Sequence, residues 1–223
     1  MKFFFSKAYI TEDNRFIRHR KMTYEEYIKY VIARRINTNY SEVIRYYRGF
    51  LKKDFESITE QAVNKQRKYI SSDLFKDLSK HLLTNCIIKF KGFSKYNGYY
   101  VLAGDASIFD LPVDKRTITE MKVKKNKKTD RYNSRARVSC FMDVFSNLIV
   151  TAKIVPKKIP EVKLAISHLL DIKDSFDLSK VITTYDRGYA SLELIVVTEC
   201  LGSKFLIRLK KNTFKNKVKK NEV

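Results

Sequence analysis

The sequence predicts an α/β protein in which a mixed β-sheet with flanking helices follows a small all-α domain. Up to residue 95, apolar residues recur at helical spacing between short polar links. After that point, short β-type runs alternate with two apolar helical segments. An antiparallel pair followed by strand–helix–strand crossovers is typical of a mixed sheet. We therefore expect a helical domain over 1–95 and an α/β domain over 96–223.

The N-terminal region contains four expected helices, and each has a polar residue that can cap its start. The expected caps are Thr23 with Glu26, Ser41, Ser57 with Glu60, and Ser72. Short helices joined by short links are typical of a small helical domain that could contain a helix-turn-helix. The third helix contains Lys65, Arg67 and Lys68. These side chains either face DNA or form a solvated basic surface, and the sequence leaves both interpretations open.

The C-terminal region contains five expected strands, at residues 99–103, 137–143, 148–155, 181–185 and 204–209. Four residues, 144–147, separate the second and third strands and predict a hairpin. Pro160 begins the first helix of this region. The second helix runs from Ser191 to Leu201, and Gly202 ends it.

The charge balance indicates a polyanionic partner. Lys and Arg number 46 and Asp and Glu number 24, which gives a net charge of +22. Such a surface binds nucleic acid by counterion release, and we prefer this partner to an anionic membrane or to no partner. Residues 115–137 hold ten basic and two acidic side chains, and residues 204–223 hold eight and one. Both stretches, including Lys124 and Lys125, are candidate contacts with the DNA backbone. The competing interpretation of 122–128 is a disordered loop, which is compatible with contact to DNA.

Several protein classes are excluded by pattern. The longest stretches without a charged residue are nine residues, so no segment is expected to span a bilayer. The three cysteines lie far apart without zinc-site spacing, and we expect them to be reduced. The sequence contains no P-loop, GxGxxG or HExxH motif. We expect a cytoplasmic, nucleoid-associated protein.

Two aspartates follow expected strands and are the candidates for chemistry. Asp105 comes after the strand at 99–103, and Asp186 after the strand at 181–185. If these strands are neighbours, the carboxylates converge and suit a hard cation such as Mg²⁺ or Mn²⁺. A capping or turn role for each aspartate is the competing interpretation. Asp110, Asp114 and Asp143 compete for the first position, and a turn role is expected for Asp143.

Three short sequence motifs support the catalytic interpretation. Gly-Asp-Ala-Ser at 104–107, Asp-Arg-Gly-Tyr at 186–189 and Phe-Leu-Ile-Arg-Leu-Lys at 205–210 occur in order. This set strongly resembles the bacterial insertion-sequence transposases of the DDE type, in the branch with a DRGY box. The similarity extends upstream through Thr-Glu-Gln-Ala at 59–62 and covers roughly residues 24–211. The first box differs from the commoner DGT or DGS.

The resemblance implies a ribonuclease-H-like core and a metal-dependent DNA strand transfer. Asp105 and Asp186 would be two of three acids that bind Mg²⁺, or Mn²⁺, in a two-metal mechanism. Arg187 and Tyr189 would lie beside the site near the DNA backbone, and Ser107 matches the hydroxyl position after the first acid. The implied partners are element ends and target DNA, with a homodimer formed on the DNA.

The third acid of the family is a glutamate in a Y-R-E-K-type motif well beyond the 205–210 segment. Only 14 residues follow Leu209, and Glu222 is the one acid among them. We therefore expect a core that is truncated at its C-terminus and a chain that transfers strands weakly or not at all. The alternative is a non-catalytic DNA-binding remnant, or an inhibitor of a full-length transposase. A ribonuclease-H-like nuclease outside transposition ranks lower.

Overall fold

The computed structural model describes residues 7–17, 22–35, 38–52, 59–87, 94–125 and 132–210. Contacts divide the chain into two compact units, residues 1–78 and 79–223. The division lies before the residue 95 boundary that the sequence suggested. One reason is that Leu83, which follows the last helix of the first region, is buried in the core of the second unit.

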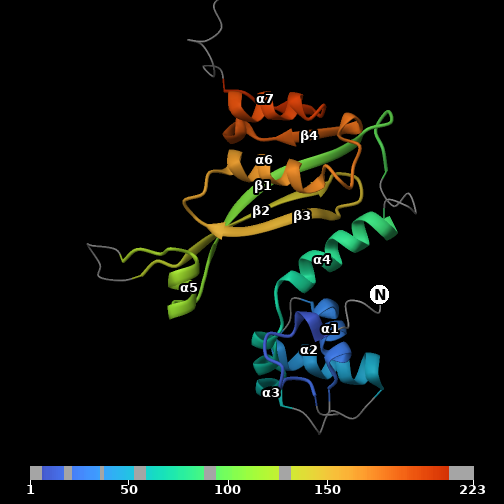
Figure 1. The fold of residues 1–223 in the computed structure, drawn as a ribbon, viewed down its shortest axis with the longest axis vertical. Helices are drawn as coiled ribbons and strands as arrows, with labels where there is room; N and C mark the ends of the chain where they lie inside the picture. Colours follow the sequence, from blue (N-terminus) through green and yellow to red (C-terminus); the bar gives the residue numbers. More distant parts are fainter. Residues whose placement is uncertain are drawn as a thin grey trace, which may run out of the picture. The chain divides into compact units, whose positions relative to one another are not determined.

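The first unit is built from helices (Figure 1). They are α1 (Tyr24–Ala33), α2 (Asn39–Tyr46), α3 (Glu60–Gln66) and α4 (Asp73–His81), with α4 running across the unit boundary. The capping box of α1 is present as predicted. The Glu26 N–H donates to Thr23 Oγ1 (3.2 Å), and the Thr23 N–H donates to Glu26 Oε2 (2.8 Å).

Two of the predicted caps are wrong, because a nearby threonine takes the role. Thr38 caps α2 and accepts a hydrogen bond from the Ser41 N–H (3.3 Å), so Ser41 lies inside the helix. Thr59 caps α3 by accepting from the Ala62 N–H (3.2 Å), and Ser57 lies outside the described residues. Closely spaced hydroxyl residues satisfy the same sequence rule, and only the backbone conformation distinguishes them.

The core of the first unit is rich in tyrosine. Tyr27, Tyr30, Tyr46 and Tyr47 are almost completely buried, and the rings of Tyr30 and Tyr46 meet edge-on with centroids 5.5 Å apart. A fully buried carboxylate, Glu42, is paired with Arg45 at 2.6 Å and accepts the N–H of Arg35 at 3.0 Å. Burial of this charge is tolerated because both of its oxygens have donors.

The second unit contains a five-stranded mixed sheet (Figure 1). Its strands are β1 (Tyr100–Asp110), β2 (Arg135–Asp143), β3 (Ile149–Pro156), β4 (Val181–Tyr185) and β5 (Lys204–Ile207). The order across the sheet is β3-β2-β1-β4-β5. Neighbours are antiparallel from β1 to β3 and parallel from β1 through β4 to β5. The predicted α/β class, a mixed sheet with flanking helices preceded by a helical region, is confirmed.

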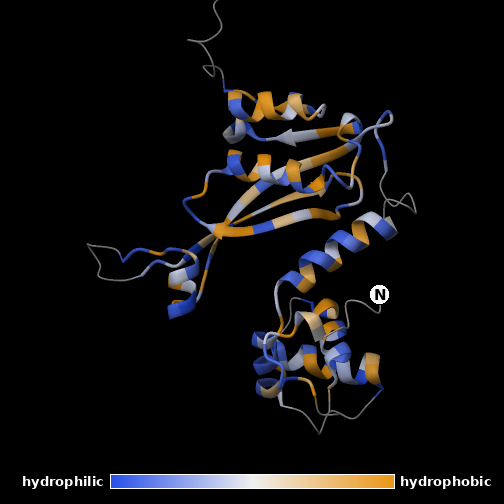
Figure 2. Cartoon of the chain, in the orientation of Figure 1, coloured by the Kyte–Doolittle hydropathy of each residue, from blue (hydrophilic) through white to orange (hydrophobic). Residues whose placement is uncertain are grey.

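Two helices pack on the sheet and bury its core. The first, α6 (Glu161–Ile172), contacts β1, β2 and β3, and the second, α7 (Leu192–Cys200), contacts β5 and α6. Figure 2 shows hydrophobic residues along both helices and the central strands. The largest fully buried side chains here are Leu102, Phe141, Leu169, Ile172, Tyr189 and Leu194. Gly202, with φ of +72°, ends α7 as predicted.

Two elements differ from the sequence prediction. Strand β1 continues to Asp110 because β2 pairs with it over its length, from Leu102 opposite Asp143 to Asp110 opposite Arg135. A further helix, α5 (Lys115–Glu120), was not expected. It begins where Asp114 Oδ1 accepts the Thr117 N–H at 2.8 Å. No helix in the described parts of the chain has the length and apolar character needed to cross a bilayer.

Candidate active site

The candidate site lies where β1 and β4 stop pairing. Gly104 opposite Tyr185 is the last pair of these parallel strands, and Asp105 and Asp186 are the next residues along each chain segment. Both aspartates are exposed. The sequence predicted that Asp105 follows its strand, and this is wrong. Asp105 lies inside β1, which continues alongside β2 with Asp105 opposite Cys140. The condition that the sequence set for convergence of the two carboxylates, that their strands are neighbours, is therefore met.

Asp186 also holds the turn that follows β4. It caps the 3-10 turn η8 (Arg187–Tyr189), where its Oδ1 accepts the N–H of Gly188. A Cβ on Gly188 would lie 3.0 Å from this oxygen. The capping role that the sequence left open for Asp186 is thus present. It orients the carboxylate at the exposed end of β4.

A glycine is required beside the first aspartate. A Cβ on Gly104 would lie 2.6 Å from Tyr185 Cε1 and 2.8 Å from Phe141 Cε1. Both rings are buried, with Tyr185 6% and Phe141 1% exposed. The close approach of β1 to these rings therefore sets the position of the backbone from which Asp105 projects.

The donor set fits a hard divalent cation. Two exposed carboxylates at adjacent strand positions offer the oxygen ligands that Mg²⁺ and Mn²⁺ prefer. Within the described ranges, no group of three or more His, Cys, Asp or Glu side chains is gathered closely enough to hold a metal ion. A ligand in addition to Asp105 and Asp186 would therefore have to come from a side chain that rearranges or from elsewhere.

The other residues predicted for the site are divided between surface and interior. Ser107 and Arg187 are exposed. Tyr189 is only 2% exposed, and its ring stacks on that of Tyr185 with centroids 5.1 Å apart. Burial, followed by the negative charges of Glu161 and Asp105, raises the pKa of Tyr189. Its side chain is therefore part of the core and does not reach the protein surface.

The predicted DNA-contacting lysines and arginines are exposed in both units. In the first unit, Lys65 lies on α3, while Arg67 and Lys68 lie on the 3-10 turn η5 (Arg67–Tyr69) and not on the helix itself. In the second unit, Lys124 and Lys125 are exposed on the segment between β1 and β2.

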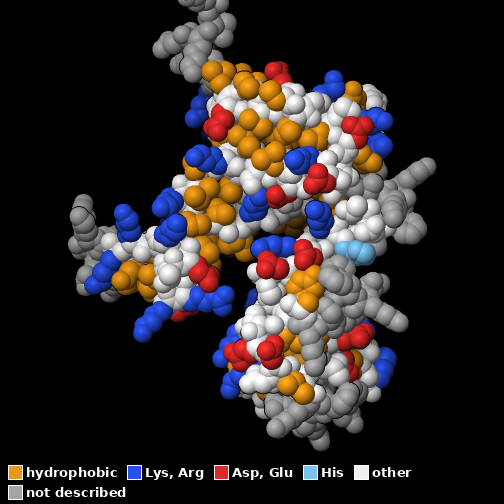
Figure 3. Space-filling model, in the orientation of Figure 1, with side chains coloured by type: hydrophobic (Ala, Val, Ile, Leu, Met, Phe, Trp, Pro, Cys, Tyr) orange, Lys and Arg blue, Asp and Glu red, His pale blue; other side chains and the backbone are white. Residues whose placement is uncertain are grey.

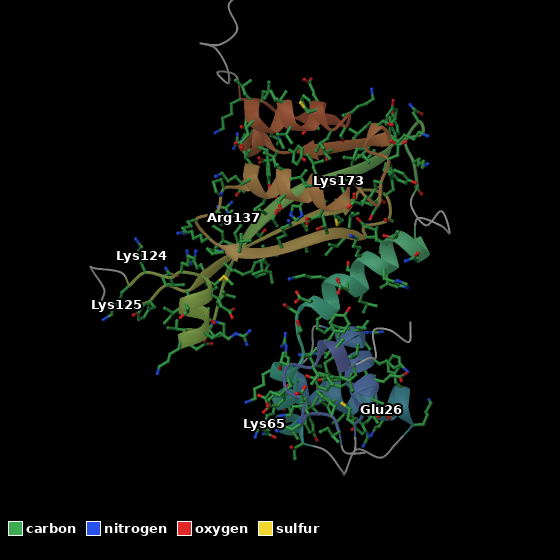
Figure 4. All side chains as sticks on the ribbon, in the orientation of Figure 1. Glu26, Lys65, Lys124, Lys125, Arg137 and Lys173 are labelled. Carbon is green, nitrogen blue, oxygen red and sulfur yellow. The ribbon has the colours of Figure 1, made fainter. Side chains whose placement is uncertain are left out.

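We call residues 111–134 the basic arm, and 126–131 of it lie outside the described residues. Figure 3 shows Lys and Arg side chains over this arm. Figure 4 shows Lys124 and Lys125 far out on it and Arg137 near its junction with the sheet. The arm therefore places positive charge on an extension that begins beyond Asp105 on the same strand.

The competing acids have structural roles. Asp143 is fully buried, and its Oδ2 accepts from the Ser146 N–H (2.7 Å) and hydroxyl (2.6 Å), which is the expected turn role. Asp110 is paired with Arg135 at 2.7 Å, and Asp114 caps α5.

The buried histidine on α6 has a structural role. His168 is fully buried, and its ring nitrogens bond to Ser139 Oγ (3.1 Å) and Thr151 Oγ1 (3.3 Å). Burial, together with the positive charge of Lys153, lowers the pKa of His168 to about 4. A neutral, enclosed imidazole of this kind holds α6 onto β2 and β3.

Sequence reasoning missed an ion pair beside the site. Glu161, in the first turn of α6, is paired with Arg137 of β2. Glu161 Oε2 lies 3.6 Å from the position of a Cβ on Gly188. An acid in the first turn of a helix is common for electrostatic reasons, so the sequence contained no signal that separates Glu161 from an ordinary helix-start residue.

Comparison with known proteins decides the family. The profile described as "Transposase DDE domain" matches residues 96–222, more than half of the chain. The chain belongs to the transposase DDE domain family. Transposase DDE domains generally work with divalent metal ions, which agrees with the chemistry of the carboxylate pair. No curated protein matches the chain.

Solved structures with similar folds are distant from this DDE-domain chain. The piggyBac transposase in its synaptic complex with hairpin DNA aligns over 92% of this chain and 46% of the piggyBac chain, at 10% identity and TM-score 0.44. The Mos1 transposase paired-end complex aligns over 82% and 57%, at 10% identity and TM-score 0.34. The intasome of simian T-cell lymphotropic virus with a PP2A regulatory subunit aligns over 55% and 36%, at 20% identity and TM-score 0.34. The chain thus spans between a third and just over half of these proteins.

Proposed function

We propose that this DDE-domain chain is a DNA transposase of a bacterial insertion sequence, in the branch marked by the Asp-Arg-Gly-Tyr box at 186–189. It would cut DNA at element ends and join the ends to target DNA, and we expect this activity to be weak because only two of the family's three acids, Asp105 and Asp186, are assigned in this chain. The observation that supports this most is the parallel pairing of β1 with β4, which brings Asp105 and Asp186 to adjacent positions in a transposase DDE domain. Two carboxylates at adjacent strand positions suit the metal-dependent chemistry of phosphodiester transfer.

Asp105 and Asp186 are the residues that would hold Mg²⁺ or Mn²⁺. When bound, such ions activate a water or a 3′-OH and stabilise the leaving oxygen of a phosphodiester in a two-metal mechanism. Asp186 is oriented for this role by its bond from the Gly188 N–H. Arg187, exposed on the same turn, would donate to a phosphate oxygen. The hydroxyl of Ser107 lies two residues beyond Asp105 on β1 and would contact the same backbone.

DNA binding would rest on exposed positive charge. Lys124 and Lys125 of the basic arm would contact phosphates, as would Lys65, Arg67 and Lys68 of the helical unit. Each phosphate contact that is lost should reduce the slope of log affinity against log salt by about 0.9. We propose that two chains act together as a homodimer on paired ends, in the cytoplasm on nucleoid DNA.

The decisive test is cleavage of end-containing DNA by the purified chain in Mg²⁺ or Mn²⁺. Asp105→Asn and Asp186→Asn should abolish cleavage while DNA binding at fixed salt is retained. Asp110→Asn is the matched control, because it removes an exposed carboxylate from the same strand. Cleavage that survives both site substitutions would refute the assignment. Metal-independent binding by a wild-type chain that never cleaves would favour the alternative, a non-catalytic DNA-binding remnant or inhibitor.

A further inference from the structure

Glu161 lies next to the proposed metal-binding aspartate, across a glycine. The position of a Cβ on Gly188 would be 3.0 Å from Asp186 Oδ1 and 3.6 Å from Glu161 Oε2. The two carboxylates therefore face the same small space at the start of η8, although they come from the end of β4 and the first turn of α6. Gly188 keeps this space open because it has no side chain.

An arginine side chain already neutralises Glu161. Glu161 Oε1 is paired with the guanidinium of Arg137, whose side chain is 15% exposed against 34% for Glu161. Arg137 projects from β2, where it lies opposite Ile108 of β1. The chain therefore supplies its own positive charge, partly shielded from water, beside two carboxylates that would otherwise repel each other.

A buried tyrosine lies near both Glu161 and the other aspartate. The Tyr189 hydroxyl is buried and has no hydrogen-bond partner among the residues that the structure describes. After burial itself, the negative charges of Glu161 and Asp105 raise the pKa of Tyr189. Buried hydroxyls are normally satisfied, so this one is available for a hydrogen bond beside the two acids.

We propose that Glu161 is a further carboxylate ligand of the divalent-metal site, and that it exchanges Arg137 for the ion when the ion binds. This inference rests on the proposed function, which assigns the metal to Asp105 and Asp186. Rearrangement is required, because no three acids in the described residues are already gathered around one point. The exchange starts from a short separation, since Glu161 Oε2 already faces the space beside Asp186.

The test is Mn²⁺ binding to the full chain, measured from the electron paramagnetic resonance signal of free Mn²⁺, without DNA or turnover. Glu161→Gln should raise the Kd for Mn²⁺ at least about tenfold, the lower end of what losing even an outer partner of a metal site costs. Glu161→Asp retains the charge but shortens the reach, and it should weaken binding similarly. A role of Glu161 through charge alone predicts that Glu161→Asp binds as wild type does.

Two further variants separate ligation from general electrostatics. Asp171→Asn is the matched control, because it removes an ion-paired acid from the other end of α6, where it pairs with Lys153 at 2.8 Å. It should change the Kd by less than about twofold, since exposed charges at a distance are screened. Arg137→Ala should tighten Mn²⁺ binding in the wild-type chain but not in the Glu161→Gln chain, because Arg137 acts by occupying Glu161.

The outcomes distinguish this inference from the proposal on which it rests. Weaker binding in Asp105→Asn and Asp186→Asn, with unchanged binding in Glu161→Gln and Glu161→Asp, would overturn the role of Glu161 alone. Unchanged binding in the aspartate variants, or a wild-type chain that binds no Mn²⁺, would overturn the metal pair itself. Thermal unfolding of each variant identifies any loss of binding that comes from unfolding.

Discussion

Replacing Gly104 with alanine tests whether close packing against β4 holds the candidate site in place. The new methyl group would lie 2.6 Å from Tyr185 Cε1 and 2.8 Å from Phe141 Cε1, whereas carbon atoms pack best at about 3.5–4.0 Å. One ring or the strand has to shift by about 1 Å, and both rings are enclosed by the core. Overpacking of this kind costs about 1–3 kcal/mol.

The net effect follows from two opposing contributions. Alanine lowers the conformational entropy of the unfolded chain relative to glycine, which stabilises the folded state by roughly 0.5–1 kcal/mol. With overpacking near the upper end of its range, we expect a net loss of about 2 kcal/mol. For a chain of 223 residues this corresponds to a fall in Tm of roughly 4–8 °C.

The assay is thermal unfolding followed by circular dichroism. Gly49→Ala is the control, because nothing lies within 4 Å of a Cβ there, and this variant should unfold at or slightly above the wild-type temperature. A Gly104→Ala chain with unchanged Tm would refute the reasoning, since it would mean that the Tyr185 and Phe141 rings yield without cost.

Three further substitutions have defined outcomes. The pKa of His168 is about 4 in the folded chain and near 6.5 in the unfolded chain, so only the unfolded state gains a proton between these pH values. The free energy of unfolding should therefore fall by roughly 3 kcal/mol as the pH drops from 6.5 to 4. Denaturant titrations of His168→Gln should show a flatter dependence of stability on pH. Asp143→Ala removes two hydrogen bonds from Ser146 and should cost about 1–3 kcal/mol in urea unfolding without changing Mn²⁺ affinity, whereas a loss of affinity would contradict its turn role. Glu42→Gln removes the buried partner of Arg45 and should destabilise the helical unit by about 1–3 kcal/mol; an unchanged urea midpoint would show that this pair contributes nothing.

Local rules predicted the elements well where one residue type determines the outcome. The α1 capping box and the Gly202 helix end are present because a reciprocal side-chain bond and a positive φ leave few alternatives. The caps at Thr38 and Thr59 were missed because a second hydroxyl residue lies nearby. The extension of β1 to Asp110 was missed because pairing with β2, and not alternation in β1 itself, makes it a strand.

The candidate site was predictable to the extent that strand order was. Asp105 and Asp186 were identified as strand-end acids, but their adjacency depends on the β1–β4 pairing, which is a property of the folded sheet. The ion pair of Glu161 with Arg137 joins a helix to a strand 24 positions earlier. No local pattern in either segment predicts that contact, so it is visible only in the three-dimensional structure.

The register of β1 against β4 also has a thermodynamic consequence. The two aspartates belong to segments separated by most of the second unit and meet only when Gly104 and Tyr185 are paired. An ion held by both side chains can bind the native sheet but not the unfolded chain, so its binding free energy adds to folding stability by RT ln(1 + [L]/Kd). At an ion concentration of 100 Kd this amounts to about 2.7 kcal/mol. The divalent cation of the proposed site would thus act as a folding ligand as well as a reagent.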